Sequence, residues 1–131
     1  RVTVERRLRS ESGEIMEKHS TVIDGRRHMW HTERLWELAA DLPRFQVEIE
    51  SFSELDQDCW FGTTTPTIRE VADHCRRINR VDVEAPVIIN ANGRLMDGGH
   101  RIARALLDGR TTVPAVQFAE MPTPDAIEDV E

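Results

Sequence analysis

The sequence predicts an α+β fold in which a small mixed sheet packs against helices, with a hairpin extension at the N-terminus. Two short apolar runs rich in β-branched residues, 86–89 and 112–118, flank a segment at 102–107 whose apolar residues have helical spacing. Residues 45–49 alternate between apolar and polar side chains, the pattern of a strand with one buried face. A length of 131 residues fits one domain with a modest core.

We divide the chain into three parts. Residues 1–19 are a charged extension in which a weak alternation of apolar residues predicts a hairpin. Residues 20–118 form the single domain. Residues 119–131 contain no basic residue, and we expect a flexible acidic tail there. The acidic residues of this tail are Glu120, Asp125, Glu128, Asp129 and Glu131.

Two helices are predicted before the central strands. The first runs over 33–41, and Trp36 lies beside its apolar face, which predicts a core position for the indole, with base stacking as the alternative. The second begins at Thr67 and Glu70, whose spacing is that of a capping box. Cys75 lies on the apolar stripe of this helix, so we expect its thiol to be buried.

Turn residues punctuate the predicted strands. Asp24–Gly25 and Asn92–Gly93 are both two-residue hairpin signals, because these residues tolerate positive φ. Pro114 lies within the last predicted strand and cannot donate a ladder hydrogen bond. We therefore expect Pro114 on an edge strand or at a strand start.

The central feature of the sequence is a strand that ends at Asp97 and a helix that begins on two glycines. The start of such a helix presents unpaired backbone N–H groups, and Gly98 and Gly99 allow close approach of a phosphate. Arg101 adds a guanidinium suited to phosphate, and His100 adds a donor that titrates near neutral pH. Asp97 can cap the helix or hold a metal ion. The alternative is a strand–helix corner in which glycine only satisfies backbone geometry.

Composition restricts the classes of partner. The net charge of −7 and the pI of about 5.2 disfavour DNA, which selects basic surfaces. No apolar run reaches the length of a membrane span, so no membrane partner is expected. Cys59 and Cys75 are too few for a disulfide framework, and we expect reduced thiols in a cytoplasmic protein.

Residues 83–118 resemble the ParB/sulfiredoxin superfamily, which includes ParB N-terminal domains, sulfiredoxin and a free-serine kinase. The resemblance is carried by Pro-Val-Ile-Ile at 86–89, Asn-Gly at 92–93, Asp-Gly-Gly-His-Arg-Ile-Ala-Arg-Ala at 97–105, Gly109, and Val-Pro-Ala-Val at 113–116. Gly99 stands where sulfiredoxin has its cysteine, so sulfiredoxin chemistry is not expected.

The resemblance implies a nucleotide site that takes ATP or CTP with Mg²⁺. The phosphates would lie on Gly98, Gly99, His100 and Arg101, with Asp97 reaching Mg²⁺ through the phosphates. Phosphotransfer or nucleotide hydrolysis is the implied activity, with candidate catalytic residues Asp97, His100, Glu50 and Glu54. Minor candidates for the site are His74, Arg69 and Arg104.

Two other classes of function remain open. One is a DNA-associated module of the partition or nuclease type, and the other is an interaction protein without turnover. A homodimer is compatible with any of the three. Nucleotide binding that depends on Arg101 would distinguish the first class from the others.

Overall fold

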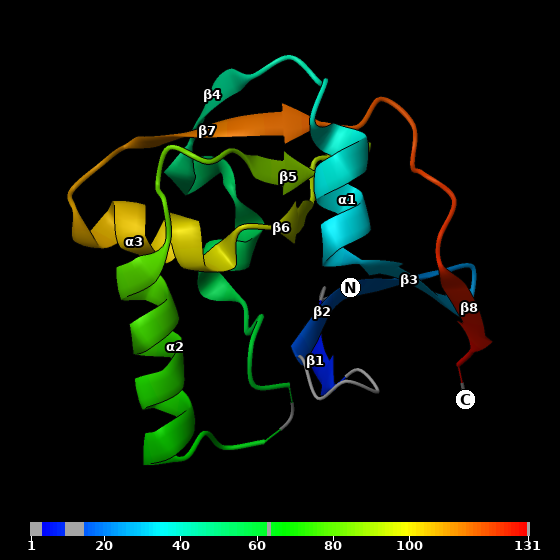
Figure 1. Cartoon of the computed structure of the whole chain (residues 1–131), viewed down its shortest axis with the longest axis horizontal. Helices are drawn as coiled ribbons and strands as arrows, with labels where there is room; N and C mark the ends of the chain where they lie inside the picture. The colour runs from blue at the N-terminus through cyan, green and yellow to red at the C-terminus, as the bar shows by residue number, and fades with distance from the viewer. Residues whose placement is uncertain (1–3, 10–14, 63, 131) are drawn as a thin grey trace.

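We describe a computed structural model of the chain, which covers the backbone of residues 4–9, 15–62 and 64–130 and the side chains of residues 18–62 and 64–130. This part of the chain forms two four-stranded sheets and three α-helices, which confirms the α+β class (Figure 1). Among the described residues, none of the helices has the length and apolar character that crossing a bilayer requires.

The elements follow one another along the chain with short connections. They are β1 (Val4–Arg9), β2 (Ile15–Ile23), β3 (Arg26–His31), α1 (Thr32–Ala39), β4 (Phe45–Glu48), the 3₁₀ turns η1 (Ile49–Ser51) and η2 (Ser53–Asp56), α2 (Ile68–Arg80), β5 (Val87–Ile89), β6 (Leu95–Asp97), α3 (Gly99–Leu107), β7 (Thr112–Gln117) and β8 (Ala126–Asp129).

The first sheet has the strand order β1-β2-β3-β8, and all its pairs are antiparallel. The hairpin predicted at Asp24–Gly25 is confirmed, since both residues have positive φ between β2 and β3. The predicted N-terminal hairpin is confirmed as the β1–β2 pair, with Val4 opposite Ser20. Its turn at 10–14 lies outside the described residues.

The prediction of a flexible acidic tail is wrong over Ala126–Asp129. This segment is β8, which pairs with β3 and places its carboxylates opposite arginines. Arg26 Nε lies 3.2 Å from Asp129, and Arg27 lies 4.0 Å from Glu128. The arginines that pair with the acidic residues of the tail are thus far from it in the sequence. The composition of the tail alone could not reveal them.

The second sheet has the order β4-β7-β5-β6, with β5 and β7 parallel. β7 is therefore an interior strand, and the expected edge position of Pro114 is wrong. The parallel pairing with β5 begins at Ala115, one residue after the proline, so the β5–β7 ladder starts where an N–H is again present.

Both faces of the second sheet are buried. Val87 and Ile89 point to a cluster that includes Ile102 of α3, whereas Ile88 points to a cluster that includes Leu35 of α1. Helix α3 thus covers one face and α1 covers the other. The predicted core position of Trp36 is wrong, since its side chain lies at the edge of this layer with 49% of its surface exposed.

Helix α2 begins at the predicted capping box: Thr67 accepts from the Glu70 N–H, and Glu70 accepts from the Thr67 N–H. The helix lies beside α3, and its N-terminal turns extend away from the second sheet (Figure 1). None of its residues is buried, and Cys75 is exposed, which corrects the prediction of a buried thiol. Apolar spacing predicted the helix correctly but could not show that the stripe lacks a covering element.

Candidate functional site

The two glycines before α3 are required by packing. Gly98 caps the helix with a φ of +121°, and a Cβ there would lie 2.5 Å from Cγ1 of Val87. A Cβ on Gly99 would lie 3.3 Å from Nε1 of Trp60, whose indole covers this residue. Both small residues therefore have a structural reason to be present, which is the alternative stated for this corner. Of the four residues predicted to hold the phosphates, only Arg101 lines the Arg101 cavity described below, whereas Gly99 lines the Trp60 cavity and Gly98 and His100 line neither.

Asp97 and Arg101 face each other across the corner. Nη2 of Arg101 lies 2.6 Å from Oδ2 of Asp97, and the indole N–H of Trp36 donates to the same oxygen at 2.7 Å. These contacts fix the carboxylate as an acceptor for two protein donors. Nε of Arg101 has no hydrogen-bond partner among the described residues, so the guanidinium keeps unused donor capacity.

His100 turns toward α2 and forms a stack with two other rings. Its Nε2 lies 2.7 Å from Nδ1 of His74, and the indole of Trp60 stacks on both imidazoles with centroid distances of 4.5 and 4.8 Å. Only 5% of His100 is exposed. The structure thus brings together His74 and His100, which were both candidates for the nucleotide site. Nδ1 of His74 and Nε2 of His100 contact each other.

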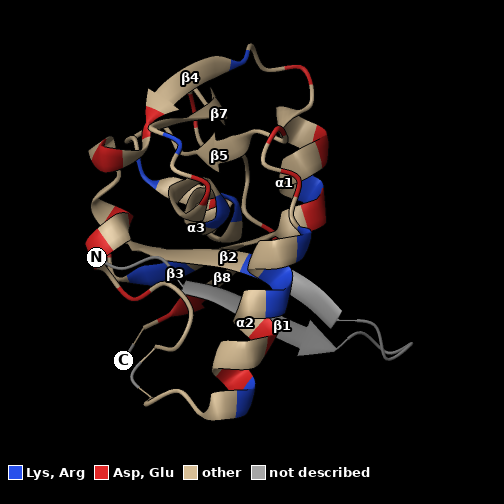
Figure 2. Cartoon of the chain, turned by 90° about the vertical axis from the view of Figure 1, so that its left-hand side faces the viewer, with Lys and Arg blue, Asp and Glu red and all other residues tan. Residues whose placement is uncertain are grey.

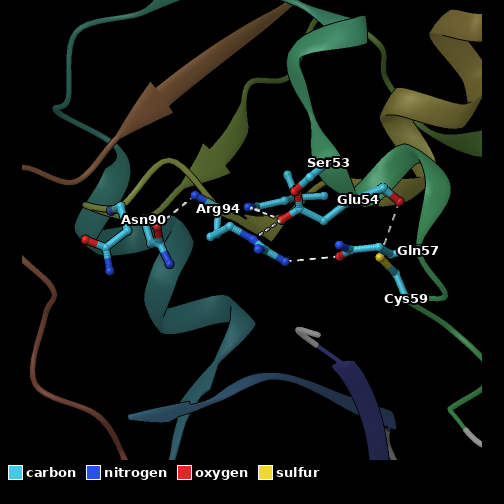
Figure 3. Close-up of polar contacts among 8 residues, drawn as sticks. Ser53, Glu54, Gln57, Cys59, Asn90 and Arg94 are labelled. Carbon is cyan, nitrogen blue, oxygen red and sulfur yellow. Dashed lines mark hydrogen bonds and ion pairs between the residues drawn. The ribbon is translucent and has the colours of Figure 1, made fainter. Parts of the chain in front are cut away.

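The two candidate glutamates have different environments. Glu50 is exposed on η1, whereas Glu54 is buried and receives hydrogen bonds from the Leu95 N–H at 2.8 Å and from Nε of Arg94 at 3.2 Å. Figure 3 shows that Arg94 also reaches Gln57, beside Cys59. Glu54 therefore anchors η2 to the β5–β6 hairpin.

The minor arginine candidates lie outside the corner. Arg69 is exposed on α2. Arg104 pairs with Asp108 at 3.1 Å and donates to the carbonyl of Asn79, which ties α3 to the end of α2. Neither residue lines a cavity described below.

Two cavities of similar size flank the start of α3. The Arg101 cavity has a volume of about 450 Å³ and lies between α1 and the second sheet. The Trp60 cavity has a volume of about 440 Å³ and lies between α3 and the segment 52–66. Both volumes fall in the range that small-molecule sites occupy, about 300–1,000 Å³. The residues of the Arg101 cavity are Trp36, Ala39, Ala40, Leu42, Arg44, Ala85, Pro86, Ile88, Arg101 and Val116.

The linings of the two cavities carry opposite charge. The described lining of the Arg101 cavity contains Arg44 and Arg101 and no carboxylate. That of the Trp60 cavity contains Glu54 and Asp58 and no lysine or arginine. Because Asp97 pairs with Arg101 and Arg94 pairs with Glu54, the lining charges without a described ion pair are Arg44 at the first cavity and Asp58 at the second. The first cavity is therefore the better suited to an anion.

His19 on β2 is a buried residue that the sequence analysis missed. It has no exposed surface, its ring lies 5.8 Å from that of Trp30, and neither ring nitrogen has a hydrogen-bond partner among the described residues. Burial lowers the pKa of His19 from 6.5 to about 4, while the charges of Asp97 and Glu54 oppose this shift. The available signal was the Asp24–Gly25 turn, which implies a strand before it, and that strand extends back through His19.

The described residues contain no group of three or more His, Cys, Asp or Glu side chains placed to hold a metal ion. Asp97, the predicted Mg²⁺ contact, offers Oδ2 to Arg101 and Trp36. These residues do not fit a metal site built from protein ligands alone. Mg²⁺ in nucleotide sites is held chiefly by phosphates and water with one or two carboxylates, so it would enter with the nucleotide.

Comparisons with protein-family models, with curated proteins and with solved structures found no match. The fold and the site together define an α+β domain with two ligand-sized cavities on either side of one helix start.

Proposed function

We propose that this chain is a nucleotide-binding domain of the ParB/sulfiredoxin type and that it holds ATP or CTP in the Arg101 cavity. The observation that carries the proposal is the position of Arg101. Its side chain lines a cavity of about 450 Å³ and is 14% exposed, while Nε has no partner among the described residues. A buried guanidinium N–H without an acceptor costs about 1–3 kcal/mol. Because Nε has almost no accessible surface, a phosphate oxygen would recover this cost only if the Arg101 side chain shifts toward the cavity.

The charge of the cavity supports an anionic ligand. Arg44 is exposed at the same cavity, and its Nη1 reaches only the carbonyl of Glu84, at 3.4 Å, among its described contacts. Two guanidinium groups line the cavity; Asp97 pairs with that of Arg101, and that of Arg44 has no described ion pair, so the cavity is locally basic in a chain of net charge −7. Charge-assisted pairing with phosphate is stronger than a neutral hydrogen bond, and arginine can make it with two parallel donors.

The rest of the lining supports an aromatic base. Trp36 exposes 49% of its side chain, and aliphatic groups of Leu42, Pro86 and Val116 complete the walls. Stacking of a base on an aromatic side chain contributes about 1–3 kcal/mol and tolerates different bases. This lining therefore accommodates adenine or cytosine without selecting between them.

The two buried candidate carboxylates, Asp97 and Glu54, already accept hydrogen bonds from the protein, which favours nucleotide binding over catalysis. Asp97 would have to release Arg101 or Trp36 to contact a Mg²⁺ ion on the phosphates. Glu54 is engaged by Arg94 and the Leu95 N–H. Phosphotransfer or hydrolysis therefore requires a rearrangement of one of these contacts, and we assign nucleotide binding as the primary function.

DNA binding is supported less well. The first half of α2 carries both signs of charge and the second half carries arginines, as Figure 2 shows, and Arg76 pairs with Asp73 of the same helix. A surface of mixed sign releases few counterions from a duplex. Salt-sensitive binding of DNA in the absence of nucleotide binding would reverse this order.

Nucleotide titration followed by thermal shift tests the proposal, with ATP and CTP each measured with Mg²⁺ and with EDTA. A ligand that binds the native state raises Tm. At a ligand concentration of about 100 times Kd, the free energy of unfolding increases by about 2.7 kcal/mol. Ala40→Phe fills the Arg101 cavity and should abolish the shift, whereas Ala103→Phe, in the Trp60 cavity, should leave it unchanged. Absence of a shift with either nucleotide would reject the proposal.

A further inference from the structure

The Trp60 cavity is separate from the proposed nucleotide site and has its own chemistry. It lies on the other side of the α3 start and shares no residue with the Arg101 cavity. Its walls are mainly apolar: Phe52, Leu55 and Trp60 come from the segment after β4, and Ile102, Ala103 and Leu106 come from α3. A concave apolar site of this size with a few polar groups is the usual form of a small-molecule site.

The polar groups of this cavity are acidic. Asp58 is exposed, and its Oδ1 accepts the backbone N–H groups of Trp60 and Phe61 at 3.0 and 2.9 Å. A carboxylate has two oxygens and about four lone-pair sites, so these two bonds leave acceptor capacity. Arg94 pairs with Glu54 but does not line the cavity. Glu54 is therefore compensated, and Asp58 is the carboxylate of the described lining that carries a charge without a described ion pair.

Aromatic rings stand beside these carboxylates. The rings of Trp60 and Phe61 lie edge to face with centroids 6.4 Å apart, and both line the cavity. Aromatic faces attract ammonium groups. The imidazoles of His74 and His100 stack on the Trp60 indole, so the ring surface available to an ammonium group is the part of Trp60 that they leave uncovered and that of Phe61. An apolar wall, the Asp58 carboxylate and aromatic rings in one cavity are complementary to an apolar body that carries a single positive charge.

We propose that the Trp60 cavity binds a small organic amine, with its aromatic or aliphatic body against α3 and its ammonium group near Asp58. The same chemistry excludes the nucleotide, because phosphates would meet Glu54 and Asp58 without a cation in the described lining. The chain thus has two sites of opposite charge preference, one on each side of the α3 start.

Three indole compounds that differ in charge test this proposal: tryptamine, indole and indole-3-propionate. Binding is read from protection of the Cys59 thiol against alkylation, in a Cys75→Ser background that removes the exposed second thiol. We expect tryptamine to bind at least fivefold more tightly than indole, and indole-3-propionate to bind more weakly than either. Equal binding of all three, preference for the anion, or no protection by any would overturn the proposal.

Two variants distinguish this cavity from the other. Ala103→Phe fills the Trp60 cavity and should weaken tryptamine binding at least tenfold, whereas Ala40→Phe should have no effect. Asp58→Asn keeps an oxygen for the Trp60 and Phe61 N–H groups but removes the charge, so it should weaken tryptamine severalfold and leave indole unchanged. Loss of tryptamine binding in Ala40→Phe alone would contradict the assignment, and neither result depends on whether ATP or CTP binds.

Discussion

Asp97 and Arg101 form an ion pair of 2.6 Å across the first turn of α3, with 9% and 14% of their side chains exposed. The pair joins the end of β6 to the helix that follows. The indole N–H of Trp36 donates to the same carboxylate oxygen, so α1 is tied to this corner as well. The residue that we propose as the phosphate contact is therefore also part of the packing of the fold.

Removal of Arg101 should destabilise the domain. Arg101→Met leaves the Asp97 carboxylate buried with only Trp36 as a described side-chain donor, and breaking a buried pair in this way costs about 3–5 kcal/mol. Urea unfolding at pH 7 measures the loss. Arg104→Ala is the matched control, because Arg104 and Asp108 have the same spacing but are 34% and 38% exposed. The control should cost no more than about 1 kcal/mol, and equal losses in both variants would contradict the account.

The two glycines before α3 should respond differently to alanine. Gly98→Ala places a methyl group 2.5 Å from Cγ1 of Val87 at a φ of +121°, so we expect a loss of about 3 kcal/mol or more. Gly99→Ala meets only Nε1 of Trp60 at 3.3 Å, and about 1 kcal/mol is expected. Gly109→Ala, with a φ of +75° and open space around it, isolates the backbone cost alone, about 1–2 kcal/mol. Thermal unfolding of the three variants tests this order, and a harmless Gly98→Ala would refute it.

Stability should decline as the pH falls below about 6.5, owing to His19. The pKa of this residue is about 4 in the folded state and 6.5 in the unfolded chain, so the unfolded state binds more protons between these values. The difference corresponds to about 3 kcal/mol, fully present above pH 6.5 and lost as the pH falls toward 4. His19→Phe should remove this component of the pH dependence. Urea unfolding at pH 7.5 and pH 5.0 gives the measurement, and an equal change in both proteins would exclude the role of His19.

The C-terminal segment should contribute to stability. The indole N–H of Trp30 donates to the carbonyl of Pro122 at 2.9 Å, and Arg34 pairs with Asp125 at 3.2 Å. Deletion of 119–131 removes both contacts and uncovers Trp30, so it should cost about 2 kcal/mol or more. Deletion of 126–131 alone removes β8 and should cost less. If both deletions leave Tm unchanged, the tail is dispensable, as its composition had suggested.

Local signals in the sequence were sufficient for much of the fold. The capping box at Thr67, the Asp24–Gly25 turn and the strand–glycine–helix corner at 97–99 depend on residues close together in the chain, and all are present. The pairing of β8 with β3 depends on residues about 100 positions apart, such as Arg26 and Asp129. Spacing within either segment carries no information about that partner.

The site could be predicted only as a set of residue types. Asp97, Arg101 and His100 were recognised as residues of one corner, but the side chains that occupy it, Trp36 and Trp60, come from distant segments. Arg44 was not predicted, because a lone arginine before a strand has no local signature. Tertiary packing places arginines at one cavity and carboxylates at the other, which the sequence does not show.

Isothermal titration of ATP and CTP into the wild-type chain, Arg44→Ala and Arg76→Ala tests nucleotide binding in the Arg101 cavity most directly. Arg44 is exposed and lines this cavity, so its removal should leave the fold intact and weaken binding about tenfold, as loss of one charge-assisted contact predicts. Arg76 is exposed on α2, and its removal should change nothing. If both variants bind the nucleotides as tightly as the wild-type chain does, or if the wild-type chain binds neither nucleotide, the account is contradicted.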